Sequence, residues 1–180
     1  LLRMKLGGFN NRKYDNPMCY AASIGYSNQK LYDLSQTLIV GKKNPFPKTA
    51  DLSYIDVYDM CTEKMGLKKW EIKLGHTHKE MGIPWNEPAP LERWEEIIGY
   101  CVNDVNATEA VFDARQGDFM ARKIQVALVE LLHPGEGIKV CVNDTTNTLS
   151  KRIIFGKEIS RLQTYCKDRS RVTSRNGKYD

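Results

Sequence analysis

The sequence contains no run of about 18 apolar residues, so no segment has the composition of a membrane-spanning helix. Its five cysteines are scattered and never spaced as Cys-x-x-Cys, which argues against a zinc site or a disulfide framework and favours a reducing cytoplasm. The opening Leu-Leu-Arg-Met-Lys-Leu has neither an initiator Met nor the pattern of a secretion signal. We therefore interpret the sequence as a chain cut into from upstream, with the composition of one ordinary soluble domain.

The net charge of +5 is not spread evenly along the chain. Residues 151–180 hold nine Lys or Arg against three Asp or Glu, whereas residues 1–150 hold eighteen against nineteen. Basicity thus belongs to the tail, and it permits nucleic-acid binding without indicating it. We expect residues 157–180 to be a poorly ordered basic tail.

Turn residues and apolar periodicity predict an alternation of strands and helices. Two strands are expected at residues 2–9 and 51–58, and a further short strand at residues 152–155. Helices are expected over residues 18–24, after an Asn16 cap and with Pro17 as the first helical residue, and over residues 28–40, with Ser27 as cap. Two shorter helices are expected over residues 67–74 and 91–98. After a bend near Gly99, a long helix should run to about residue 133, where Pro134, Gly135 and Gly137 end it.

The stretch from Gly99 to Phe112 places a phenol and a carboxylate four residues apart. On a helix, Tyr100 and Asp104 lie on one face. An apolar residue recurs every seven positions on what we take to be the opposite, core-facing side, at Val105, Phe112, Phe119 and Val126. On spacing alone, the simpler interpretation is an ordinary helical Asp beside a half-buried Tyr.

A second stretch, from Gly7 to Asn16, is a short apolar run that ends in a polar loop with an acid at Asp15. Asn11-x-x-Tyr-Asp15 and Tyr100-x-x-x-Asp104 together resemble the second and third exonuclease motifs of DnaQ-like 3′–5′ exonucleases. The longer stretch from Gly8 to about Gly156 resembles the proofreading exonuclease region of phage and prophage family B DNA polymerases. The segments that carry this resemblance, besides the two motifs, are Leu67–Gly75, Gly82–Trp85, Tyr100–Phe112 and Asn143–Leu149.

The resemblance implies an α/β fold of the ribonuclease H-like exonuclease type, with a long C-terminal helix, over residues 1–156. It also implies that the first strands of that fold are missing here. The expected activity is proofreading removal of nucleotides from DNA 3′ ends during phage DNA replication. The expected partners are a single-stranded DNA 3′ end and a polymerase domain in the same full-length chain, in the cytoplasm of a bacterial host.

The resemblance also assigns roles to particular residues. Two hard divalent ions, Mg²⁺ or Mn²⁺, suit the displacement of a 3′ oxygen from phosphorus by water. Asp104 would bind the ion that activates the water, and Asp15 would support the second ion. Tyr100 would orient the attacking water through its hydroxyl. Asn11, together with Asn10, would contact the frayed single strand.

The sequence departs from the family pattern at the first motif. No Asp-x-Glu occurs before Asp15, so two of the family's four carboxylates are absent, and we expect this chain alone to be inactive or nearly so. One alternative is a non-catalytic nucleic-acid-binding or scaffolding domain that keeps a degenerate nuclease fold. Another is an unrelated helical domain in which Tyr100 and Asp104 are ordinary surface groups.

Overall fold

The structure, a computed structural model, describes residues 5–77, 80–83, 87 and 89–158. The chain divides into two compact units, Leu1–Phe119 and Met120–Asp180. The predicted domain boundary at residue 156 falls within the second unit, and most of the predicted basic tail lies outside the described residues.

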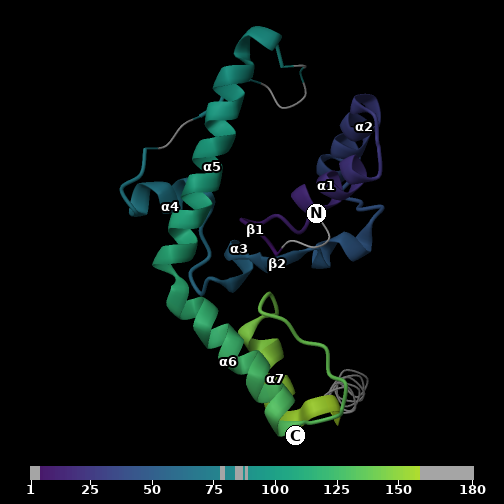
Figure 1. The fold of residues 1–180 in the computed structure, drawn as a ribbon, viewed down its shortest axis with the longest axis vertical. Coiled ribbons are helices and arrows are strands. Elements are labelled where there is room, and N and C mark those ends of the chain that lie inside the picture. The colour runs from purple at the N-terminus through teal and green to yellow at the C-terminus, as the bar shows by residue number, and fades with distance from the viewer. Residues whose placement is uncertain (1–4, 78–79, 84–86, 88, 159–180) are drawn as a thin grey trace, which may run out of the picture. The chain divides into compact units, whose positions relative to one another are not determined.

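Figure 1 shows the order of the elements along the chain. In sequence order they are β1 (Leu6–Gly8), α1 (Asp15–Ser23), α2 (Asn28–Ile39), η1 (Pro47–Asp51), β2 (Ser53–Asp56), α3 (Val57–Met60), α4 (Leu67–Lys73), η2 (Leu91–Arg93), α5 (Trp94–Ala114), α6 (Gln116–Leu132), α7 (Thr146–Phe155) and η3 (Gly156–Glu158), where η denotes a 3₁₀ helix. None of the helices in the described residues has both the length and the apolar character needed to cross a bilayer.

The first unit contains one pair of parallel strands within its described residues, β1 beside β2 (Figure 1). Both strands lie inside the predicted ranges but are shorter, and residues 2–4 lie outside the described part of the chain. Parallel pairing requires a long crossover, which α1, α2 and η1 supply. A mostly helical unit with so small a sheet neither confirms nor excludes the ribonuclease H-like arrangement, so that fold class stays a prediction.

Helix α2 begins where the sequence indicates, because the Ser27 side chain accepts a hydrogen bond from the backbone N–H of Lys30. Helix α1 begins at Asp15, two residues before the predicted first residue Pro17, and Asn16 is not its cap. The Asn16 side chain instead donates to the Ser53 hydroxyl at 2.7 Å in the interior. A buried tertiary hydrogen bond has taken the place of a local cap.

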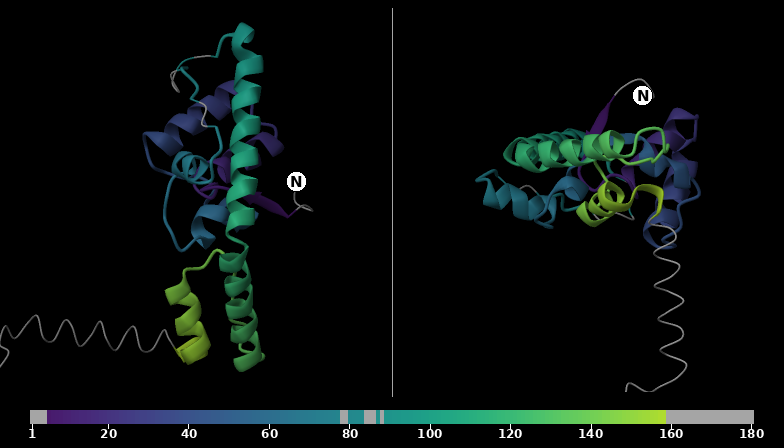
Figure 2. Two further views of the ribbon diagram at one scale, coloured as in Figure 1. Left: turned by 90° about the vertical axis from the view of Figure 1, so that its left-hand side faces the viewer. Right: turned by 90° about the horizontal axis from the view of Figure 1, so that it is seen from below.

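The predicted helix over residues 67–74 is confirmed as α4, which lies beside α5 (Figures 1 and 2). Gly75 ends it in the left-handed region at φ +75°, where glycine is unstrained. Trp70 is buried beneath it, and Asn103 of α5 donates to Glu71 of α4 at 2.6 Å. These contacts fix α4 against the middle of α5.

The long helix differs from the prediction in where it is interrupted. Helix α5 runs without a break through Gly99, since one glycine costs a helix interior only about 1 kcal/mol. The interruption falls instead at Arg115, whose guanidinium contacts Asp118 at 2.6 Å and the Thr62 hydroxyl at 2.7 Å. The predicted end of α6 before Pro134 is confirmed.

The predicted apolar stripe does not form the core. Val105 is 66% exposed, and the three phenylalanine and valine positions that follow it in the repeat are only half-buried. The buried residues of α5 are Ala107 and Val111, and Tyr100 and Asp104 lie on this same inward face, three to seven residues away. A seven-residue count drifts around a 3.6-residue helix, and here it also crosses the break at Arg115.

In the second unit, α7 lies beside the last turns of α6 (Figure 2). The predicted strand at residues 152–155 is wrong, because these residues end α7. Thr145 caps α7 by accepting from the Thr148 N–H at 3.1 Å, and Leu149 is fully buried. A strong cap and one buried leucine outweigh the β-propensity of a short apolar run.

Candidate functional site

The first unit contains a cavity of about 710 Å³ that brings together segments far apart in the sequence. We call it the carboxylate cavity. Asn11 and Asp15 line it from the loop after β1 and the start of α1, and Asp104 lines it from α5. Ile55 of β2 and Val57 of α3 add apolar surface. Two of the residues expected to bind metal thus face one cavity, together with one of the two expected to contact DNA.

The loop between β1 and α1 positions Asp15. Asn10 adopts a left-handed conformation at φ 56°, and its backbone N–H donates to Asp56 at 2.8 Å. Arg12 extends from the loop to the Ala50 carbonyl and to the Asp59 carboxylate, at 3.1 Å each. These bonds tie the loop to η1 and α3, so the start of α1 has a defined place.

A chain of buried side-chain hydrogen bonds underlies the same loop. The Ser53 hydroxyl accepts from Asn16 at 2.7 Å and donates to the Asn11 amide oxygen at 3.2 Å. Gly8 lies so close that a Cβ there would overlap the Asn11 amide group. Asn11 therefore lines the cavity as a buried, hydrogen-bonded residue, whereas Asn10 is exposed and is not among the residues that line the cavity.

Asp15 is exposed as a residue, but its carboxyl group is at the cavity wall. Partial burial there raises the pKa of Asp15, and the negative charge of Asp56 raises it further, while its own backbone N–H opposes the shift. Asp104 is not among the groups that shift this pKa. The two expected metal ligands share a cavity, but the acid whose charge reaches Asp15 is Asp56.

Asp56 itself has a structural role at the start of α3. Its carboxylate caps α3 by accepting from the backbone N–H of Tyr58 at 3.0 Å and of Asp59 at 3.4 Å. Burial raises the pKa of Asp56, and the hydrogen bond from the Asn10 backbone opposes that shift. This buried acid holds the loop and the helix start together.

Tyr100 and Asp104 contact each other on the inward face of α5, as their spacing indicates. Burial raises the pKa of the Tyr100 hydroxyl, and the charge of Asp104 together with a side-chain hydrogen bond to it raises it further. The positive charge of Lys68, from α4, acts in the opposite direction. At neutral pH the Tyr100 phenol is therefore protonated and donates to the Asp104 carboxylate.

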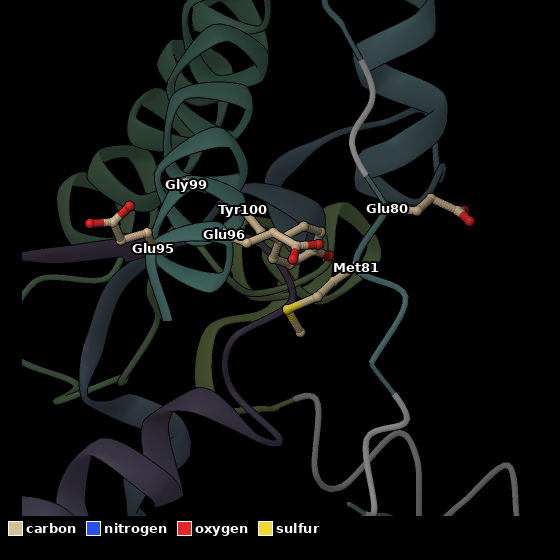
Figure 3. A pocket seen from close by; sticks show the side chains of 6 residues that line it. All are labelled: Glu80, Met81, Glu95, Glu96, Gly99 and Tyr100. Carbon is tan, nitrogen blue, oxygen red and sulfur yellow. The ribbon is translucent and has the colours of Figure 1, made fainter. Parts of the chain in front are cut away.

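Tyr100 does not line the carboxylate cavity but a neighbouring hollow of about 460 Å³. Figure 3 shows Glu96 and Tyr100 projecting from the start of α5 toward Met81, with Glu95 on the other side of the helix. The phenol thus stands one helical turn from the cavity wall. Its link to the cavity is the hydrogen bond with Asp104.

The carboxylates of the cavity meet only part of what a two-ion site requires. Mg²⁺ is commonly held by one or two carboxylates, with water and substrate phosphate completing its six ligands. Asp15 and Asp104 supply that number of carboxylates, and both line the carboxylate cavity. They fall short of two ions, because in the described residues no group of three or more His, Cys, Asp or Glu is arranged to hold a metal.

Some residues near the site were given no role in the sequence analysis. Lys5 and Glu109 also line the carboxylate cavity. The pKa of Lys68 is raised mainly by its 2.8 Å hydrogen bond with Glu80, with smaller contributions from Tyr100 and Asp104. Lys68 and Glu109 lie in segments that carry the resemblance, but the resemblance assigns neither a role, and it is the packing of α4 against α5 that brings Lys68 near the site. No protein-family model, curated protein or solved structure matches this chain.

Proposed function

We propose that this chain is a fragment of a proofreading 3′–5′ exonuclease domain, of the tyrosine-containing type found in phage DNA polymerases. The observation that carries the proposal is the carboxylate cavity. Asp15 and Asp104, which lie 89 positions apart in the sequence, both line it, and Tyr100 hydrogen-bonds to Asp104. These are the three residues to which the resemblance assigns roles in catalysis.

The residues act on a single-stranded DNA 3′ end in this proposal. Asp15 and Asp104 present carboxylate oxygens to a divalent ion, Mg²⁺ or Mn²⁺, which would activate water and stabilise the leaving 3′ oxygen. Tyr100 stays protonated and directs its hydroxyl toward the Asp104 side of the site. The largely apolar walls of the cavity accept a base or sugar, and Asn11 lines the wall with an amide oxygen that already accepts one hydrogen bond, from Ser53.

The donor set for the second ion is incomplete, and the chain alone is expected to be inactive or nearly so. The resemblance implies that a complete site has two further carboxylates, from an Asp-x-Glu strand, and that it works together with a polymerase domain. The complete protein would act in the cytoplasm of a bacterial host.

Metal binding tests the proposal even if cleavage is absent. Titration of the chain with Mn²⁺, followed by the loss of the free-ion electron paramagnetic resonance signal, gives the affinity of the site. Asp15→Asn and Asp104→Asn should each weaken Mn²⁺ binding by about tenfold or more, because each removes one of two charged ligands. Asp113→Asn, an exposed carboxylate on α5 outside the cavity, should leave it unchanged and serves as the matched control.

A nuclease assay completes the test. The chain with Mg²⁺ should leave a 3′-terminated single strand largely intact, and fusion to an upstream Asp-x-Glu segment should produce cleavage that Asp104→Asn abolishes. Equal Mn²⁺ affinity for all three variants would contradict the proposed site.

A second candidate is a non-catalytic nucleic-acid-binding or scaffolding domain with a degenerate nuclease fold. It is favoured by the lack, within the described residues, of a third metal-binding side chain near Asp15 and Asp104. It predicts binding to single-stranded DNA that does not change when Mg²⁺ is removed or when Asp104 becomes Asn.

A further inference from the structure

The second unit carries a hollow of about 400 Å³ whose charged lining is entirely positive. It is lined by Gly137, Ile138, Lys139, Arg152 and Lys157, and we call it the basic hollow. No Asp or Glu is among these residues. Because all of its described lining belongs to the second unit, it is separate from the carboxylate cavity.

Each of the three positive side chains of the hollow comes from a defined backbone element. Lys139 follows a turn in which Gly137 has φ +62°, a conformation suited to glycine. Arg152 belongs to the last turn of α7, and its guanidinium donates to the Gly156 carbonyl at 3.1 Å. Lys157 comes next, in η3. Thus a turn, a helix and a 3₁₀ helix bring three positive side chains to one hollow.

None of these cations forms an ion pair in the described residues, although the charge of Lys157 helps to lower the pKa of Glu136, which places this acid near the hollow. The Glu136 carboxylate accepts hydrogen bonds from His133 at 3.1 Å and from the backbone N–H of Lys157 at 2.9 Å. Within residues 120–158, neither Lys139 nor Lys157 forms an ion pair, and the guanidinium of Arg152 has no hydrogen-bond acceptor besides Gly156. Three like charges around one concave surface favour the arrival of an anion.

We propose that the basic hollow binds a phosphate group. An arginine fork bonds two phosphate oxygens at once, and lysines add compact positive charge. The phosphate has two sources of the same chemistry, the backbone of a nucleic-acid strand or free inorganic phosphate. The excess of nine basic over three acidic residues in positions 151–180 favours the polyanion. The proposal uses no residue of the carboxylate cavity and stands or falls independently of the nuclease assignment.

Binding of a short fluorescein-labelled oligothymidylate tests this site on the full chain. Fluorescence anisotropy is recorded in EDTA, so metal binding at Asp15 and Asp104 does not enter the measurement. Arg152→Gln and Lys157→Gln should each weaken binding by about threefold to tenfold at low salt. Each should also reduce the slope of log affinity against log salt by about 0.7 for the phosphate contact it removes.

Lys151→Gln is the matched control. It makes the same change of charge in α7, next to Arg152, but does not line the hollow. Its affinity and salt slope should stay near those of the unaltered chain, and circular dichroism should show that all variants fold.

Inorganic phosphate distinguishes the two sources. Displacement of the oligonucleotide by low-millimolar phosphate, lost in Arg152→Gln, would assign the hollow to the free ion as well as to the backbone. Insensitivity to phosphate, with the oligonucleotide still dependent on Arg152, would assign it to a nucleic-acid strand alone. The proposal is overturned if Lys151→Gln weakens binding as much as Lys157→Gln, or if neither probe responds to the substitutions that line the hollow.

Discussion

The buried hydrogen-bond chain beneath the carboxylate cavity makes Ser53 a sensitive position. Its hydroxyl serves Asn16 at 2.7 Å and Asn11 at 3.2 Å, and all three residues are at most 7% exposed. Ser53→Ala would leave a buried amide N–H and a buried amide oxygen without this partner. Each unsatisfied group costs about 1–3 kcal/mol, so we expect the free energy of unfolding to fall by about 2–4 kcal/mol, after some relaxation of the two amides.

Urea unfolding followed by tryptophan fluorescence measures this loss. The three tryptophans, at positions 70, 85 and 94, all belong to the first unit, so the signal reports the unit that contains Ser53. With a slope of about 2 kcal/mol per molar urea, the midpoint should fall by about 1–2 M. Ser23→Ala is the control, because its exposed hydroxyl donates to the Tyr20 carbonyl and its loss should cost about 0.5 kcal/mol or less.

A double-mutant cycle separates the hydrogen bond from the loss of the hydroxyl itself. Combined with Asn16→Ala, Ser53→Ala should show a coupling free energy of about 1 kcal/mol or more. Additive losses, or a Ser53→Ala variant as stable as Ser23→Ala, would refute the idea that this chain holds the loop in place.

Three further predictions concern stability. The pKa of His133 is raised, chiefly by the backbone carbonyl that its Nε2 contacts and also by Glu136, so its stabilising effect should be complete below about pH 6.5 and disappear as pH rises through the folded-state pKa. Thermal melts should show His133→Asn losing its disadvantage toward pH 8, and a pH-independent difference would contradict this. Gly156→Ala should lower the free energy of unfolding by about 2 kcal/mol or more, because the added Cβ would lie 2.6 Å from His133 Nδ1. Gly25→Ala, also at positive φ but in open space, should lower it by about 1 kcal/mol. Urea unfolding followed by circular dichroism measures both losses, and equal losses would argue against the clash. By the same measurement, Trp70→Phe should lower the free energy of unfolding by less than about 1.5 kcal/mol, because the buried indole N–H that it removes has no partner in the described residues. Trp70→Ala should lower it by about 3–5 kcal/mol. Similar losses for the two variants would contradict this prediction.

Sequence alone located the elements whose ends depend on local chemistry. Ser27 caps α2 and Gly75 ends α4 because these signals act over one turn of backbone. Residues 152–155 were wrongly predicted as a strand, because the cap and the burial that make them helical lie several residues upstream, at Thr145 and Leu149. Asn16 was wrongly predicted as a helix cap, because its hydrogen-bond partner, Ser53, is remote in the sequence.

The candidate site was predictable only where spacing along one helix decides the geometry. Four-residue spacing put Tyr100 and Asp104 on one face, and they hydrogen-bond there. Their face was misassigned relative to the core, because Ala107 and Val111, which are small and follow no seven-residue repeat, are the residues that α5 buries. The positive charge of Lys68 near this pair depends on the packing of α4 against α5, which no local pattern encodes.

The unbroken course of α5 through Gly99 gives the two acids of the cavity unequal freedom. Asp104 lies near the middle of α5, a continuous helix of 21 residues, so its backbone can move only together with the helix. Asp15 is an exposed first residue of α1, which has no side-chain cap, and it follows a loop that tertiary hydrogen bonds hold in place. If a cation binds in the carboxylate cavity as proposed, we therefore expect Asp104 to keep its place and the exposed side chain of Asp15 to turn toward it.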